Sequence, residues 1–297
     1  MIRLGILDFD ISHVIEFTQR LNHVGIDESQ WVDGARVVIA CPGDSTIMPE
    51  RIPGYTKEIA QLGVPLVDRP EDLLGHVDGM LITSQQGAVH WERARPFLEA
   101  GISCFIDKPF TCSVADARQL VDLAARQKTP VFSSSALRYA PELVQFAADV
   151  THGAIQGAVT YGPAPLHAGN PGLFHYGIHA VEILYTLMGP GCERVVCTHH
   201  ADTDVVTGQW RDGRLGTMRG IRKGQSPYGF VAFTDTGAQS VSIGSTFFYR
   251  ELLKKIVAMF QTRQSPLDPA ESVEIVAFIE AALRSANHQS ACEEVRP

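Results

Sequence analysis

The chain has 297 residues, of which 45% are apolar and 20% charged, and its formal net charge is −8. This composition excludes a disordered chain, and the length predicts about two domains. The acidic balance argues against nucleic acid and anionic membranes as main partners. No apolar stretch approaches the ~18 residues of a membrane-spanning helix. The N-terminus lacks a signal-peptide pattern and the six scattered cysteines form no CxxC pair, so we expect a cytoplasmic protein with reduced cysteines.

The first half of the chain alternates short apolar runs with helical patterns. Strands are predicted at 2–7, 36–40, 80–83, 103–106 and 131–134, and helices at 14–21, 89–100 and 115–126. Near-continuous apolar strands that alternate with helices predict a parallel, doubly wound sheet of the Rossmann type. We expect this domain to cover residues 1–135.

The second half changes character, because strand-like runs now follow one another. They lie at 154–161, 193–200, 204–210, 215–221, 230–234 and 239–243, with a hairpin signal at Asp212-Gly213. They predict an α+β domain over residues 136–297, with a mostly antiparallel sheet and helices on one face. Trp210, Phe230 and Phe233 are candidates for its uncovered face. A C-terminal helix over about 268–286 could pack back on the first domain.

The turn after the first strand carries acids where a dinucleotide fold carries glycines. The GxGxxG pattern lets backbone N–H groups and a helix N-terminus reach a pyrophosphate. Here Asp8 and Asp10 occupy the first two glycine positions, and a like-charge pair at about 4 Å costs ~4 kcal/mol at an effective dielectric near 20. Asp10 or Ser12 could simply cap the helix, Asp10 and His13 could bind a ligand themselves, or the acids could turn away and leave the helix end open.

Polar side chains also follow the other predicted strands of the first half. Ligands of open α/β sheets bind beyond the carboxyl ends of the strands. Lys108 comes directly after a buried strand and precedes a proline, so it could donate or accept a proton there. The alternative is a salt bridge with Asp107 or another acid.

The segment 174–188 reads as a helix that is apolar nearly all round. At about 100° per residue, one polar line remains, made of His175, His179, Glu182 and Thr186. Each histidine could be a hydrogen-bonded core residue. Together the side chains predict a catalytic or substrate-binding line, or a metal site formed by His175, His179 and Glu182.

Four segments in this order resemble the Gfo/Idh/MocA family of NAD(P)-dependent sugar and polyol oxidoreductases. Ile106-Asp107-Lys108-Pro109 resembles the family's Glu-Lys-Pro motif, with Asp in place of Glu. A strand that ends at Thr83 is followed by His90, as in the family pattern. Ser135-Ala-Leu-Arg138-Tyr-Ala-Pro141 resembles Asn-x-Arg-Tyr-x-Pro, and the segment from His175 to Glu182 resembles Asp-x-Gly-x-His-x-x-Asp.

The resemblance implies hydride transfer between a bound NAD or NADP and a substrate hydroxyl. Lys108 and His179 would handle the hydroxyl proton, and Arg138, His167, His175 and Glu182 would line a polyol pocket. It also implies a homo-oligomer, a dimer or tetramer. The expected cofactor-binding residues are Asp8, Phe9, Asp10, Ser12, His13, Cys41, Asp44, Thr83, Ser84, Gln85, His90, Asp107 and Lys108.

Three departures from the family pattern keep other functions open. The glycine fingerprint is absent, His175 replaces the first acid of the helix motif, and Glu182 replaces the second. One alternative is a relative without dinucleotide binding that serves as a sensor or scaffold. Another is a metal-assisted lyase or hydrolase that uses His175, His179 and Glu182.

Overall fold

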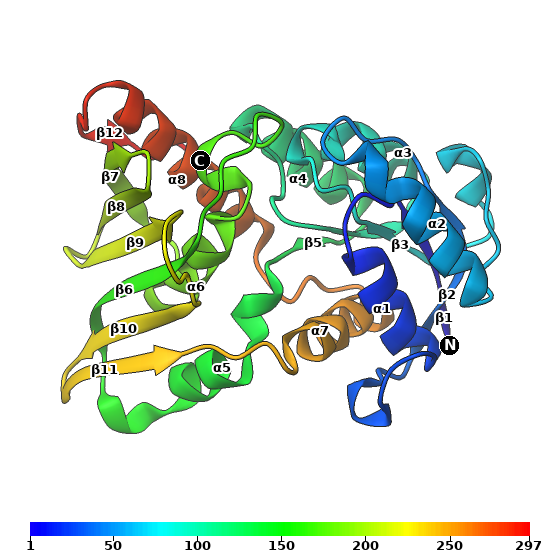
Figure 1. Cartoon of the computed structure of the whole chain (residues 1–297), viewed down its shortest axis with the longest axis horizontal. Helices are drawn as coiled ribbons and strands as arrows, with labels where there is room; N and C mark the ends of the chain where they lie inside the picture. Colours follow the sequence, from blue (N-terminus) through cyan, green and yellow to red (C-terminus); the bar gives the residue numbers. More distant parts are fainter. The chain divides into compact units, whose positions relative to one another are not determined.

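The computed structural model describes residues 1–297, which form two compact units (Figure 1). Unit 1 comprises Met1–Thr111, Ala115–Ser134 and Tyr249–Pro269, and unit 2 comprises Cys112–Val114, Ser135–Phe248 and Ala270–Pro297. The late segment that belongs to unit 1 is therefore mainly α7 (Phe248–Thr262), whereas α8 (Pro269–Asn287) belongs to unit 2 from Ala270 on. None of the helices combines the length and apolar character needed to cross a membrane.

Unit 1 contains the predicted parallel sheet, with strand order β2-β1-β3-β4-β5. Its strands are β1 (Ile2–Leu7), β2 (Ala35–Cys41), β3 (Gly79–Ile82), β4 (Ser103–Ile106) and β5 (Val131–Ser133). Its other helices are α1 (His13–Asn22), α2 (Ile52–Gln61), α3 (His90–Glu99) and α4 (Val114–Gln127). Because β1 lies between β2 and β3, the strand order reverses at β1, which is where such sheets bind ligands.

Two helices of unit 1 were not predicted from the sequence. In α2 only Ile59 is buried, and Pro53 and Gly54 at its start weaken the helical signal in the sequence. By contrast, α7 buries Leu252, Leu253, Ile256, Val257, Met259 and Phe260, and its spacing does carry a helical signal. Gly79 explains how α7 packs on β3, because a Cβ at this position would lie 2.5 Å from the Phe260 ring.

Unit 2 contains a seven-stranded sheet with strand order β11-β10-β6-β9-β8-β7-β12. The strands are β6 (Ile155–Pro163), β7 (Cys192–His200), β8 (Thr203–Trp210), β9 (Leu215–Ile221), β10 (Gly229–Thr234), β11 (Gly237–Ser242) and β12 (Glu293–Glu294). All neighbours are antiparallel except β6 and β9, which confirms the mostly antiparallel prediction. Its other helices are α5 (Pro141–Ala148) and α6 (Ile178–Met188).

The prediction for the uncovered face of this sheet was wrong for two of three aromatic residues. Trp210 is buried beside Tyr185 of α6, and Phe230 is buried beside Phe146 of α5. Phe233 alone is exposed, with 46% of its surface accessible. Alternation along a strand separates its two faces without saying which one the helices cover.

The helix predicted over 174–188 begins only at Ile178. Residues 172–174 form a 3-10 turn, and Gly177 precedes the first turn of α6. His175 therefore lies outside the helix that carries His179 and Glu182. Thr186 does not extend the predicted polar line either, because its hydroxyl donates to the Glu182 carbonyl at 2.7 Å.

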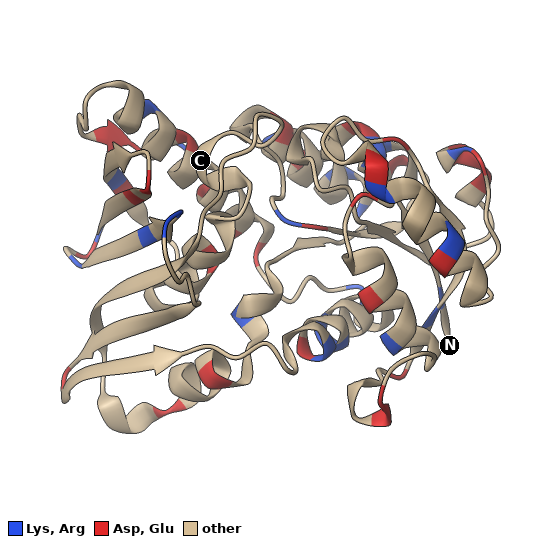
Figure 2. Cartoon of the chain, in the orientation of Figure 1, with Lys and Arg blue, Asp and Glu red and all other residues tan.

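Charged side chains are interspersed by sign within each unit, as Figure 2 shows. The longest run of Lys and Arg within a helix or strand is the pair Lys254-Lys255 in α7.

Candidate active site

Asp8 follows β1 in a left-handed conformation, with φ +70°, which Asp tolerates better than most residues. Its carboxylate is fully buried. Oδ2 accepts a hydrogen bond from Arg93 Nε at 2.9 Å and another from the Ser84 hydroxyl. The same Arg93 also pairs with Asp44. Gly43 provides the space for this arrangement, because a Cβ there would overlap the Asp8 carboxylate.

Burial raises the pKa of Asp8 to about 6, and the neighbouring Asp10 carboxylate adds to this effect, while Arg93 and Ser84 oppose it. Asp8 Oδ1 is buried and has no hydrogen-bond partner. Only one of the two Asp8 carboxylate oxygens therefore has hydrogen-bond partners within the protein.

Asp10 is also turned away from the first turn of α1. Its Oδ1 accepts the Gln85 N–H at 2.8 Å, and its Oδ2 accepts the Ser45 hydroxyl at 2.7 Å. Neither Asp10 nor Ser12 caps α1 with its side chain, so the capping prediction was wrong. The backbone N–H groups of residues 10–13 donate no hydrogen bond within the protein. The geometry thus matches the third alternative, in which the acids turn away and the helix end stays open.

His13 occupies the third glycine position, and its ring points into the unit. Nδ1 bonds to the buried Asp107 carboxylate, and Nε2 lies 3.2 Å from the Tyr249 hydroxyl. Burial opposes ionisation of Asp107, but His13 and Lys108 outweigh it, and the pKa of Asp107 is lowered. His13 therefore ties α1 to the end of β4 and does not present its ring to a ligand.

Lys108 is buried, with 3% of its surface accessible, and it makes no ion pair. Its backbone N–H, rather than its ammonium group, donates to Asp107 Oδ1 at 2.7 Å. Lys108 thus makes no direct salt bridge, although its charge helps to lower the pKa of Asp107. A buried, unpaired lysine at the carboxyl end of a parallel strand is a candidate for chemistry.

His90 connects the segments that follow β3 and β4. Its Nε2 lies 2.9 Å from the Ser84 carbonyl, and its Nδ1 lies 2.9 Å from the Pro109 carbonyl. Burial lowers the pKa of His90. This fully buried ring fixes the segment after Lys108, whose peptide bond to Pro109 is cis.

A pocket of about 250 Å³ opens at the carboxyl ends of these strands. Three of the residues predicted to bind the cofactor line it, namely Asp10, Asp44 and Ser84. Arg93 also lines it and was not predicted. The remaining lining residues are Ser45, Thr46, Gln86, Ala88, Val89 and Glu92. Phe9, Cys41, Thr83 and Gln85 are buried and do not line it.

In unit 2, a buried ion cluster supports His179. The Ser135 hydroxyl bonds to His179 Nδ1 at 2.7 Å, and the Ser135 N–H donates to Glu182 Oε1 at 3.1 Å. Arg138 Nε donates to Glu182 Oε2 at 2.8 Å. Arg138 Nη2 also lies 2.8 Å from Glu271, an ion contact without hydrogen-bond geometry. Arg138 and Glu182 thus hold the segment that positions His179.

These charges stabilise one another despite their burial. Burial opposes the charge on Arg138, but Glu182 and Glu271 outweigh it and raise the pKa of Arg138. Burial raises the pKa of Glu271, which Arg138 partly offsets.

Five aromatic rings of unit 2 follow one another around His179. His167 lies 5.1 Å from His175, His175 lies 5.0 Å from Tyr176, and Tyr176 lies 5.7 Å from His179. His179 lies 5.6 Å from Tyr228, which was not predicted. The structure thus gathers the three predicted histidines, although only one of them is on α6.

The proposed metal set does not assemble in this arrangement. No group of three or more His, Cys, Asp or Glu side chains is placed to hold a metal ion. Both carboxylate oxygens of Glu182 already accept hydrogen bonds from Ser135 and Arg138. Glu182 therefore supports the fold around His179 rather than joining His175 as a ligand.

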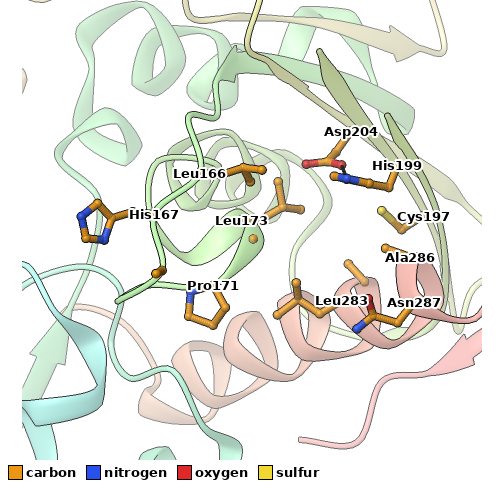
Figure 3. A pocket seen from close by; sticks show the side chains of 13 residues that line it. Leu166, His167, Pro171, Leu173, Cys197, His199, Asp204, Leu283, Ala286 and Asn287 are labelled. Carbon is orange, nitrogen blue, oxygen red and sulfur yellow. Dashed lines mark hydrogen bonds and ion pairs between the residues drawn. The ribbon is translucent and has the colours of Figure 1, made fainter. Parts of the chain in front are cut away.

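A second pocket, of about 390 Å³, lies wholly within unit 2 (Figure 3). Apolar side chains from the 166–173 segment and α8 dominate it, including Leu166, Leu173 and Leu283. His199 and Asp204 form its polar wall, bonded at 2.5 Å. In Figure 3 the His167 ring turns away from the interior. This lining suits an apolar ligand better than a polyol.

Comparison with known proteins identifies the class. Residues 48–135 match the family model described as an oxidoreductase family with an NAD-binding Rossmann fold. Unit 1 is therefore an NAD-binding domain, and the protein is an NAD(P)-dependent oxidoreductase. The matched model is that of the Gfo/Idh/MocA family, the family that the sequence motifs resemble.

Solved structures show the same two-domain fold at low sequence identity. GenD2 from gentamicin A biosynthesis, in complex with NAD, is 18% identical, with a TM-score of 0.80 and coverage of 100% of this chain and 97% of that chain. A myo-inositol dehydrogenase from Corynebacterium glutamicum is 15% identical, with a TM-score of 0.81 and coverage of 100% and 99%. A myo-inositol dehydrogenase from Lactobacillus casei, in complex with NAD(H) and myo-inositol, is 13% identical, with a TM-score of 0.81 and coverage of 100% and 97%.

The residues of unit 1 fit a nicotinamide dinucleotide despite the missing glycines. The open N–H groups of residues 11–13 would hold its pyrophosphate, since a helix N-terminus favours anions. Asp44 and Ser84 line the adjoining pocket and would contact the rest of the nucleotide. When bound, the cofactor supplies or accepts the hydride.

Proposed function

We propose that the protein transfers a hydride between its nicotinamide cofactor and a hydroxyl-bearing carbon of a sugar- or cyclitol-like polyol. Lys108 and His179 would handle the hydroxyl proton. The observation that carries this proposal is the buried, unpaired Lys108 at the carboxyl end of β4.

Lys108 is suited to stabilise a substrate oxygen. An ammonium group in a water-poor site strengthens its interaction with developing negative charge, because the local dielectric is low. His90 holds the backbone after Lys108 against Ser84, so the lysine starts from a fixed position. As an ammonium group, Lys108 can thus hold the substrate oxygen while the hydride leaves the same carbon, and the hydroxyl proton passes to His179.

His179 provides the second proton-handling group from unit 2. An imidazole bonded through Nδ1 to a fixed hydroxyl keeps its ring orientation, and its Nε2 is the atom that can exchange a proton. His167 and His175 lie in the same series of rings and supply hydrogen-bonding ring nitrogens for further hydroxyl groups.

The substrate class is supported by the nature of these side chains and by the fold. Imidazole, hydroxyl and phenol groups match a ligand with many hydroxyls and no net charge. Two structures that share the fold are myo-inositol dehydrogenases, and one of them contains myo-inositol. At 13–15% identity this likeness suggests cyclitols as the first substrates to test.

The test measures NADH or NADPH formation at 340 nm with a panel of cyclitols and sugars. We expect at least one to be oxidised by the wild-type protein. In Lys108→Met, kcat should fall by about 10³-fold or more while dinucleotide affinity changes less than about threefold. His179→Asn should lower kcat about 10²-fold. Oxidation of no polyol, or a Lys108→Met variant with wild-type kcat, would overturn the proposal.

We also propose that the protein is a cytoplasmic homo-oligomer, a dimer or tetramer. The exposed side chains of Val196 and Phe233 lie on strands of the second sheet, with 37% and 46% of their surfaces accessible. Apolar side chains on a sheet face are typical of association surfaces. Light scattering should give more than one chain mass, and Phe233→Glu should lower it. A wild-type mass of one chain would contradict this.

A further inference from the structure

Position 8 poses a physical problem for a protein that binds a dinucleotide. It is the first position of the glycine fingerprint, where glycine allows the tight turn between strand and helix beside the pyrophosphate site. A free carboxylate there would repel two phosphates and occupy the space that glycine leaves open. Dinucleotide binding by unit 1 therefore requires that something controls the Asp8 side chain.

The surroundings of Asp8 show what controls it. Arg93 reaches from the first turn of α3 and places Nε 2.9 Å from Asp8 Oδ2. The Asp8 side chain is 1% exposed and the Arg93 side chain 22%, so their pairing is largely shielded from water. The Ser84 hydroxyl adds a second hydrogen bond to the same oxygen. None of the bonds to Asp8 comes from the N-terminus of α1.

Two further residues make this arrangement possible. Gly43, with φ +64°, lies so close to the Asp8 carboxylate that any side chain would overlap it. Asp44 follows directly and pairs with the other end of the Arg93 guanidinium group. The space that glycine normally provides at position 8 is thus provided at position 43, on the turn after β2.

We propose that Arg93 is a positioning residue for the dinucleotide. It neutralises Asp8 and holds the carboxylate against β3 and α3, so that Asp8, Gly43 and Arg93 together replace the first glycine of the fingerprint. The inference rests on dinucleotide binding by unit 1 and is independent of which alcohol is oxidised.

Removing the arginine should expose the cofactor to an unpaired charge. In Arg93→Ala, the Asp8 carboxylate loses its counter-charge and its main tether, and it can rotate toward the open N–H groups of α1. We expect NAD⁺ affinity to fall at least about tenfold, because like charges in a partly buried site repel strongly. In Asp8→Gly the affinity should equal or exceed that of the wild type.

The decisive variant combines both changes. Asp8→Gly/Arg93→Ala lacks the charge that Arg93 controls, so its NAD⁺ affinity should return to within about threefold of Asp8→Gly. Arg95→Ala is the matched control, since it removes the same charge from the same helix, where Arg95 pairs with Glu92 and Glu99. Its affinity should match the wild type. Isothermal titration with NAD⁺ measures all five proteins, and circular dichroism checks their folding.

Each result bears on a separate claim. If the Arg93→Ala change lowers NAD⁺ affinity by the same factor in the wild type and in Asp8→Gly, Arg93 contacts the dinucleotide itself and the inference is wrong. Unchanged affinity in Arg93→Ala also overturns it. If Arg93→Ala does not fold, Asp8→Gly and the double variant can still be compared. A large loss of NAD⁺ affinity in the double variant would show that Arg93 contacts the dinucleotide itself. If the wild type binds neither NAD⁺ nor NADP⁺ at millimolar concentration, the cofactor assignment fails together with the inference.

Discussion

Arg93 in unit 1 and Arg138 in unit 2 are each held between two carboxylates, and the two clusters differ in exposure. In unit 1, Arg93 joins the buried Asp8 to Asp44, whose side chain is 87% exposed. In unit 2, Arg138 joins Glu182 to Glu271, and no side chain of the three is more than 11% exposed. A cluster that reaches solvent can lose a member and be rehydrated, whereas a fully buried one cannot.

The two arginine clusters also differ in their role. The unit 1 cluster compensates the charge of Asp8, which a glycine at this position would not introduce. Removing both Asp8 and Arg93 should therefore leave the dinucleotide affinity close to that of Asp8→Gly. The unit 2 cluster supports a reacting group, because Glu182 fixes Ser135 and Ser135 bonds His179. Removing a member should therefore affect both stability and turnover.

The largest effect is expected for Glu182→Ala. The change leaves Arg138 with one counter-charge and removes the acceptor of the Ser135 N–H. Breaking a buried ion pair costs about 3–5 kcal/mol, and urea unfolding measures it. Glu58→Ala, at an exposed position of α2, is the control and should cost about 1 kcal/mol or less. Equal losses in the two variants would show that the buried cluster has no special role.

The next effect concerns the pH dependence of stability in unit 1. The pKa of Asp8 is about 6 in the folded protein against 3.8 for an ordinary aspartate, mainly because of burial. The folded state binds this proton more tightly, so its contribution to stability is complete below about pH 4 and is lost as pH rises through about 6. The difference corresponds to ~3 kcal/mol as an upper bound.

The variant Asp8→Asn isolates this contribution. Arg93 and Asp10 face the same carboxyl group and remain in place. We expect the unfolding free energy of the wild type to fall relative to Asp8→Asn between pH 4 and 6.5. Parallel pH profiles for the two proteins would contradict the raised pKa.

A smaller effect is expected for the link between the unit 2 cluster and His179. Ser135→Ala removes the hydroxyl that holds Nδ1 and leaves the backbone N–H bonded to Glu182. We expect kcat to fall about tenfold, since one hydrogen bond of ~1 kcal/mol orients the ring. Ser135→Thr keeps the hydroxyl and should retain more activity. If Ser135→Ala changes KM but not kcat, Ser135 does not position His179 for catalysis.

The smallest effect is expected for Asp44→Ala, at the exposed end of the unit 1 cluster. Exposed ion pairs contribute little, so the unfolding free energy should change by less than about 0.5 kcal/mol. Thermal unfolding measures this. A loss as large as that of Glu182→Ala would remove the distinction between the two clusters.

Much of the fold could be predicted because local patterns determine it. The strands Ile2–Leu7, Ser103–Ile106 and Leu215–Ile221 have the predicted bounds, since polar or glycine residues end each apolar run. Lys108 could be singled out because it directly follows such a strand. The start of α6 was misplaced, because the apolar pattern continues through a 3-10 turn that local periodicity does not distinguish.

The side-chain partners in the site could not be predicted. Arg93 is 85 residues from Asp8, and Ser135 is 44 residues from His179. In the sequence, Arg93 is an ordinary polar residue of an amphipathic helix, so nothing indicated that it compensates Asp8. The acids at positions 8 and 10 therefore suggested repulsion of a dinucleotide, whereas the structure shows them bonded elsewhere.

The central claim is that a dinucleotide binds at the N-terminus of α1 without the glycine fingerprint. Hydrogen–deuterium exchange of the wild-type protein with and without saturating NAD⁺ or NADP⁺ tests it directly. The amides of residues 10–13 make no hydrogen bonds within the protein, so they should exchange quickly alone and slowly with the cofactor. Saturable cofactor binding that leaves the exchange of these amides unchanged would contradict the account.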